Sequence, residues 1–77
     1  MREITVDNIL NLIKQMRVEC GFSQADAAKA ANISTSFYGM IERGNRTLSV
    51  EQLIEIIKIF DCNFTDFLEM LEMSEKQ

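Results

Sequence analysis

The stretch from residue 23 to residue 44 predicts two short helices joined by a tight turn. Ser23 is followed three residues later by Asp26, and this pair resembles the capping box at which helices begin. Asn32 is a residue type that tolerates the positive φ that a tight turn favours. Ser34 is suited to cap the second helix, and Gly44 is suited to end it. The spacing therefore predicts helices over about residues 24–31 and 35–43.

Apolar periodicity predicts three further helices, one over about residues 7–19 and two within about residues 50–73, and no strand pattern competes with them. Gly21 is placed to end the first, Ser49 with Gln52 forms a second capping box, and Asn63 is placed to cap the last. Their inward stripes are expected to consist of large apolar residues: Ile9, Leu10, Ile13, Met16, Val50, Leu53, Ile54, Ile57, Phe64, Phe67, Leu68 and Leu71. The predicted fold class is all-α, with five helices in a single domain over residues 1–77.

Length and composition exclude several classes of function. With 77 residues, 47% of them apolar, the chain has room for one small core and none for a catalytic cleft between domains. It has no histidine, no phosphate-binding glycine loop and no cluster of metal ligands, so we expect no enzyme, cofactor, metal or small-molecule ligand. No apolar run approaches the ~20 residues of a membrane span, and the N-terminus lacks an apolar signal core. Cys20 and Cys62 stand apart, which indicates reduced thiols in a cytoplasmic protein.

The formal net charge of −4 argues against binding a polyanion, but the charge is unevenly distributed. Residues 1–50 carry six basic and five acidic residues, whereas residues 51–77 carry seven acidic and two basic ones. The part of the chain that includes the two short helices therefore has a formal charge of +1. The acidic part can face away from a bound duplex.

In its pattern of helices, caps and turn, the chain resembles the Cro/C1-type (XRE) helix-turn-helix family over about residues 9–71. The matching residues are Arg17, Gly21, Ser23, Gln24, Ala28, Ile33, Ser34, Ile41, Glu42, Arg43, Gly44, Arg46, Ser49 and Leu53. The resemblance implies a lambda-repressor-like DNA-binding domain, with the helix-turn-helix at about residues 24–43 and the last two helices as scaffold. Size and the run over residues 38–46 are similar to small restriction-modification controller proteins and to compact phage repressors.

In this family the second helix of the motif lies in the DNA major groove. By resemblance, its base-contact candidates here are Thr35, Ser36, Gly39, Met40 and Arg43. The phosphate-contact candidates surround that helix: Ser23, Gln24, Lys29, Asn45, Arg46, Thr47 and Ser49. The resemblance also pairs Arg17 with Glu42, an ion pair that would tie the reading helix to the first helix.

The last two helices carry more apolar residues than one small core should need, which predicts a dimer interface. Its candidates are Ile56, Ile59, Phe60, Phe64, Phe67, Met70 and Leu71. A two-fold dimer would place two reading helices about 34 Å apart on a pseudo-palindromic operator.

The sequence thus favours a sequence-specific regulator of transcription that binds double-stranded DNA as a homodimer, cytoplasmic and nucleoid-associated when bound. The alternative is an antitoxin-like protein-interaction module, which would bind a protein partner through the apolar surface of the last two helices. The acidic C-terminal part favours this alternative, whereas Gln24, Arg43 and Arg46 favour DNA.

Overall fold

The structure, a computed structural model, describes residues 5–74, with side chains described through residue 73. Five helices occupy this part of the chain: α1 (Val6–Glu19), α2 (Gln24–Ala31), α3 (Thr35–Glu42), α4 (Val50–Ile59) and α5 (Phe64–Ser74). The predicted all-α fold class is confirmed, and the predicted helix bounds agree to within one or two residues. None of the described helices is long and apolar enough to cross a membrane.

Hydroxyl side chains begin the first four helices. The Ser23 Oγ accepts a hydrogen bond from the Asp26 N–H at 3.0 Å, and the Asp26 carboxylate accepts one from the Ser23 N–H at 2.8 Å. Ser49 and Gln52 exchange the equivalent pair of bonds at the start of α4. Both predicted capping boxes are therefore present, and each satisfies amide groups that a helix leaves unpaired at its first turn.

The turn between α2 and α3 is made by Asn32, which has φ 61° and ψ 44°. This left-handed conformation confirms the role predicted for Asn32, since asparagine tolerates it better than most residues. A second left-handed residue, Asp61 with φ 59°, follows α4 and was not predicted. Aspartate, like asparagine, tolerates a positive φ. An aspartate directly after the apolar stripe of α4 was therefore the sequence signal that could have predicted this turn.

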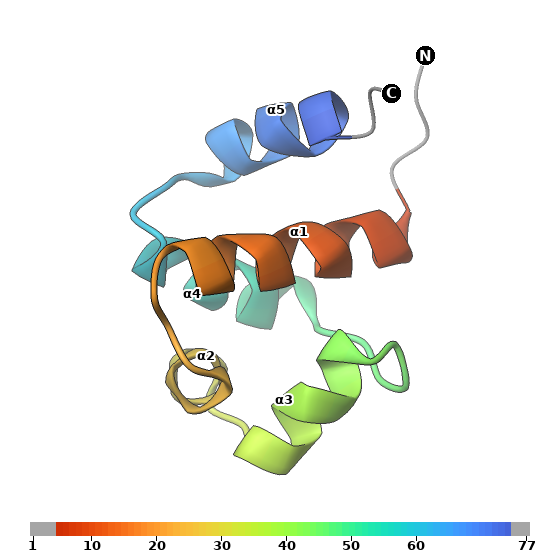
Figure 1. Ribbon diagram of the computed structural model, residues 1–77, viewed down its shortest axis with the longest axis vertical. Coiled ribbons are helices and arrows are strands. Elements are labelled where there is room, and N and C mark those ends of the chain that lie inside the picture. The colour runs from red at the N-terminus through yellow and green to blue at the C-terminus, as the bar shows by residue number, and fades with distance from the viewer. Residues whose placement is uncertain (1–4, 75–77) are drawn as a thin grey trace.

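In Figure 1, α5 lies beside α1, α4 lies behind α1, and the pair α2 and α3 extends below them. Helix α2 contacts both α3 and α4. It does so with small residues, because Ala27, Ala28 and Ala31 are buried on its inner side. Alanine side chains allow neighbouring helices to approach closely. The motif is therefore packed against the scaffold through α2, which leaves the outer side of α3 free.

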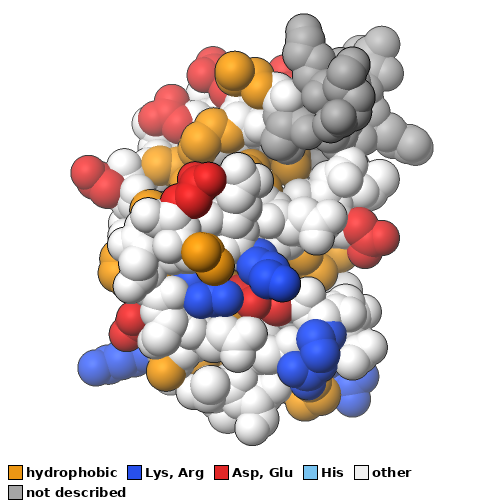
Figure 2. Space-filling view, in the orientation of Figure 1, with side chains coloured by type: hydrophobic (Ala, Val, Ile, Leu, Met, Phe, Trp, Pro, Cys, Tyr) orange, Lys and Arg blue, Asp and Glu red, His pale blue; other side chains and the backbone are white. Residues whose placement is uncertain are grey.

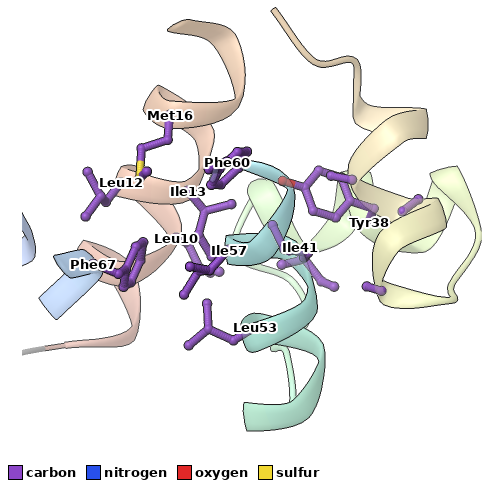
Figure 3. Packing of buried hydrophobic residues seen from close by; sticks show 14 of the residues in the cluster. Leu10, Leu12, Ile13, Met16, Tyr38, Ile41, Leu53, Ile57, Phe60 and Phe67 are labelled. Atoms are coloured by element: carbon purple, nitrogen blue, oxygen red, sulfur yellow. The ribbon is translucent and has the colours of Figure 1, made fainter. Parts of the chain in front are cut away.

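The core lies between the helices and consists of large apolar side chains (Figure 3). Tyr38 and Ile41 from α3 meet Ile13 from α1 and Ile57 from α4, and each is at most 2% exposed. On the opposite side of α1, Phe67 of α5 closes the core and is fully buried. The orientation of α3 is thus fixed by two of its own side chains.

The seven candidates for the dimer interface differ in how far the chain itself buries them. Four of them are buried in the core of the chain itself: Ile56, Phe60, Phe67 and Leu71. All four belong to the buried core cluster of the chain, in which α5 contacts α1 and α4, and their side chains are at most 7% exposed. Phe64, by contrast, is 41% exposed, and Ile59 and Met70 are half-buried. Val50, expected in the core, is 67% exposed at the first turn of α4.

Candidate nucleic-acid interface

The outer side of α3 carries an open hollow of about 480 Å³, lined by Gln24, Thr35, Ser36, Gly39, Met40 and Arg43. All five base-contact candidates therefore lie together on one face. Thr35, Ser36 and Arg43 are exposed and Met40 is half-buried. Gly39 differs from the others, because it is buried although it lies on this outer face. The Arg43 guanidinium covers it, so Gly39 has little surface of its own to offer a base.

The phosphate-contact candidates fall into two groups. Asn45, Arg46 and Thr47 are exposed in the loop after α3, where one Arg46 guanidinium nitrogen donates to the Asn45 carbonyl at 3.1 Å. Ser23 and Ser49 are exposed at the starts of α2 and α4, and each hydroxyl oxygen accepts a capping hydrogen bond. Each hydroxyl hydrogen remains able to donate. The sixth candidate, Lys29, is exposed on α2.

The seventh candidate, Gln24, has a structural contact in addition to its place in the hollow. Its side-chain nitrogen donates a hydrogen bond to Glu42 Oε1 at 3.0 Å. Glu42 thereby links the first residue of α2 to the last residue of α3. The contact fixes the relative position of the two helices of the motif.

Arg17 and Glu42 form the predicted ion pair, with 2.7 Å between Arg17 Nε and Glu42 Oε2. A second bond from Arg17 Nη2 to Oε1 at 3.2 Å makes the pair bidentate. The two side chains are only 11% and 4% exposed. Arg17 also donates to the Phe22 carbonyl at 2.8 Å, so α1 holds the start of α2 as well as the end of α3.

Tyr38 is a further hydrogen-bond donor to the Glu42 carboxylate, which was not predicted from the sequence. The Tyr38 hydroxyl donates to Glu42 Oε2 at 2.6 Å from one turn earlier on α3. The spacing of four residues was the signal that could have found it, because residues so spaced are neighbours on a helix. With Arg17, Gln24 and Tyr38 as donors, the buried carboxylate has no unsatisfied oxygen among the described residues.

These contacts set the ionisation of the cluster. Burial acts to raise the pKa of the Glu42 carboxyl, but the hydrogen bonds from Arg17, Tyr38 and Gln24 outweigh burial and lower it below the ordinary value. The pKa of the Tyr38 hydroxyl is raised, first by burial and then by the hydrogen bond to Glu42. Glu42 is therefore ionised and Tyr38 protonated around neutral pH. The net charge of the cluster is zero, because the charges of Arg17 and Glu42 cancel and Tyr38 is neutral.

Charged side chains are segregated over the surface (Figure 2). The visible basic groups lie in the lower half of that face, on the side of α2, α3 and the following loop, while most acidic groups lie in the upper half near α5. This agrees with the sequence, in which most acidic residues follow residue 50. A polyanion would be attracted to the α3 side of the molecule despite the net charge of −4.

Comparison with known proteins places this geometry in a family. Residues 13–67 match the helix-turn-helix family HTH_3. The chain is 40% identical over 57 residues to the uncharacterized HTH-type transcriptional regulator YqaF of Bacillus subtilis (strain 168), which covers 74% of this chain and 75% of YqaF. It is 40% identical over 55 residues to the HTH-type transcriptional regulator RamB of Mycobacterium tuberculosis (strain CDC 1551 / Oshkosh), which covers 71% of this chain but 12% of RamB. The chain therefore spans only a small part of RamB.

Solved structures of similar proteins share the whole arrangement of helices. The wild-type restriction-modification controller protein C.Esp1396I has a TM-score of 0.80 and 29% identity, over 94% of this chain and 95% of its own. The C.Esp1396I tetramer in complex with its natural 35 base-pair operator has a TM-score of 0.78 and 29% identity, with the same coverage of both chains. The resemblance identified from the sequence is confirmed by these matches.

Proposed function

The chain belongs to the helix-turn-helix family of DNA-binding transcriptional regulators, and we propose that it reads a pseudo-palindromic operator as a homodimer with α3 in the major groove. We assign it no enzymatic activity, because its family is one of transcriptional regulators. It would act in the cytoplasm, on the nucleoid when bound. Helices α2 and α3 form the reading motif, and α4 and α5 form its scaffold.

The observation that carries the proposal is the outer face of α3. The face is open, lies beside the basic half of the surface, and is held rigidly from behind by Tyr38, Ile41 and Glu42. Thr35 and Ser36 offer hydroxyl groups to base edges, and the Met40 side chain can contact a thymine methyl. Such small contacts discriminate weakly, at the low end of ~1–3 kcal/mol per base. The deformability of the operator would supply part of the specificity.

Phosphate contacts would position α3 without reading sequence. The first turn of α2 presents amide groups and the Ser23 hydroxyl on one side of α3, and residues 45–49 present Arg46 and Ser49 on the other. A phosphate on each side of the groove would then be contacted from one protomer. The C.Esp1396I complex with its operator supports this arrangement, because that protein shares the fold over nearly its full length.

A dimer would double the phosphate contacts and offset the sparse positive charge. We place its interface on the flank of α5 that carries Phe64 and Leu68, four residues apart on one side of the helix. Phe64 is 41% exposed, and beside it an open hollow of about 500 Å³ is lined in part by Ile54 and Cys62. This flank offers the apolar surface that the buried members of the predicted interface do not.

The proposed function is tested by selecting bound sequences from a pool of random duplexes and measuring the selected duplex by fluorescence anisotropy at several salt concentrations. We expect an inverted repeat with half-sites about 10 bp apart, and an affinity that falls steeply with salt. Weak binding to every duplex, with no enriched sequence, would contradict the proposal. That result would instead favour the antitoxin-like role, and a partner protein would then be sought by pull-down.

The dimer is tested separately by substituting Phe64→Glu and measuring mass by analytical ultracentrifugation. We expect a folded monomer, because Phe64 is exposed and its replacement opens no cavity in the core. Met73→Glu is the matched control, since Met73 is 71% exposed on the same helix but about 180° away from Phe64 around its axis. A Phe64→Glu protein that remains dimeric would show that the interface lies elsewhere.

A further inference from the structure

Gly39 lies in the interior of α3, where its backbone does not require glycine. Gly21 and Gly44 have φ of 82° and 86°, which alanine would adopt only with strain, whereas Gly39 has ordinary helical backbone. A glycine in a helix interior is unfavourable relative to alanine, because it loses more conformational freedom on folding. The reason for glycine at this position must therefore lie in what approaches it.

The side chain that approaches Gly39 is that of Arg43, which lies four residues later and caps the end of α3. A Cβ atom on Gly39 would lie 3.2 Å from Arg43 Nη1 and 4.0 Å from Arg43 Cζ. It would also lie 3.7 Å from Gln24 Oε1. The Arg43 side chain therefore runs back along α3, and its guanidinium occupies the space that any larger residue at position 39 would enter.

This conformation places the Arg43 guanidinium in the middle of the reading face, in the hollow that Thr35, Ser36 and Met40 also line. Arg46, by contrast, lies in the loop after α3 and donates to a loop carbonyl. Within residues 5–74, Arg43 forms no ion pair with a carboxylate. The neighbouring Glu42 forms its ion pair with Arg17 instead. The charge and donors of Arg43 thus remain available at the place where base edges would lie.

We propose that Gly39 is a positioning residue for DNA readout, whose missing side chain lets Arg43 lie across α3 and donate two hydrogen bonds to a guanine. This inference rests on the proposed function, since it takes α3 to lie in the major groove. Arginine recognises the O6 and N7 atoms of guanine as a bidentate pair, which depends on the position and plane of the guanidinium. An alanine at position 39 would displace the guanidinium by a few tenths of an ångström, because the atom it meets is the end of a flexible side chain.

The test compares Gly39→Ala, Arg43→Ala and the double variant on the operator selected by the wild-type chain. Gly39→Ala should raise the thermal midpoint by about 4–8 °C, as glycine-to-alanine changes do in helix interiors of small domains. It should nevertheless weaken operator binding about tenfold or more. In the Arg43→Ala background, the same change should have no further effect on affinity. Wild-type affinity in Gly39→Ala, or an equal loss in both backgrounds, would overturn the inference.

A modified operator separates base readout from phosphate contact. Replacing the guanine of each half-site in turn by 7-deazaguanine removes its N7 acceptor and leaves the phosphates unchanged. At the guanine that Arg43 contacts, the replacement should weaken binding of the wild type. The same replacement should weaken binding of Gly39→Ala and Arg43→Ala much less. Val18→Ala is the control and should keep the wild-type sensitivity, because Val18 is 59% exposed on α1 and does not line the hollow on α3. Equal losses in all four proteins at every guanine would overturn the inference, whereas a wild type that selects no duplex would refute the proposed function itself.

Discussion

Replacing Arg17 by methionine should destabilise the chain far more than removal of a surface charge. The change leaves the Glu42 carboxylate, 4% exposed, with only Tyr38 and Gln24 as donors. Removing one partner of a buried ion pair costs about 3–5 kcal/mol, because the remaining charge stays out of water. A chain of 77 residues has a total stability of roughly 4–12 kcal/mol. Arg17→Met should therefore remove about a quarter or more of the free energy of unfolding at pH 7.

The loss of stability in Arg17→Met should become smaller as the pH falls, because the substitution changes the pKa of Glu42. In the wild type the pKa of Glu42 lies below its ordinary value of 4.5, so its stabilising contribution is present above that pH and is lost as the pH falls further. Without Arg17, burial becomes the dominant influence and raises the pKa of Glu42. The folded variant then takes up a proton more readily than its unfolded chain, and it gains stability relative to wild type on acidification. The stability difference should shrink by about 1 kcal/mol or more between pH 7 and pH 4.

Urea denaturation followed by circular dichroism, at pH 7 and at pH 4, measures both effects. Lys58→Met is the matched control, because Lys58 and Glu55 form an ion pair whose side chains are 64% and 52% exposed. Its loss should cost no more than about 0.5 kcal/mol. Arg17→Met with a cost below 1 kcal/mol, or with the same cost at both pH values, would refute the reasoning about the cluster.

Three further predictions concern the turn, the core and the loop after α3. Asn32→Ala should cost about 1 kcal/mol in urea denaturation, whereas Asn32→Gly should cost nothing, because φ is 61° there. Phe67→Ala should cost about 3–5 kcal/mol, since the ring is fully buried, and a loss below 1 kcal/mol would place it outside the core. Arg46→Ala should reduce the slope of log affinity against log salt by about 1 at unchanged thermal stability, and an unchanged slope would exclude a phosphate contact.

The helices and their caps were predictable because their signals are local. The Ser23–Asp26 and Ser49–Gln52 pairs satisfy amides within one turn, and the left-handed Asn32 follows from the demands of one tight turn. The pairing of Arg17 with Glu42 spans 25 residues and followed only from the resemblance to a known family. Local signals thus sufficed for secondary structure, and the family resemblance supplied one long-range contact.

The division of apolar residues between core and surface was not predictable from periodicity. A periodic stripe shows which side of a helix is apolar, but the angle at which α5 meets α1 decides which of those residues become buried. Phe67 and Phe64 are both apolar residues of α5, yet one is fully buried and the other 41% exposed. Gly39 was likewise predicted as a base contact, and only the conformation of Arg43 shows that it is covered.

The central claim is that two copies of α3 read two half-sites on one face of the duplex. Fluorescence anisotropy on the selected operator, with and without about 5 bp inserted between the half-sites, tests it most directly. One turn of the duplex is about 10 bp, so an insertion of about 5 bp rotates the second half-site by half a turn, to the opposite face of the duplex. The account predicts that affinity falls about tenfold or more, towards that of a single half-site. Equal affinity for both duplexes would contradict it.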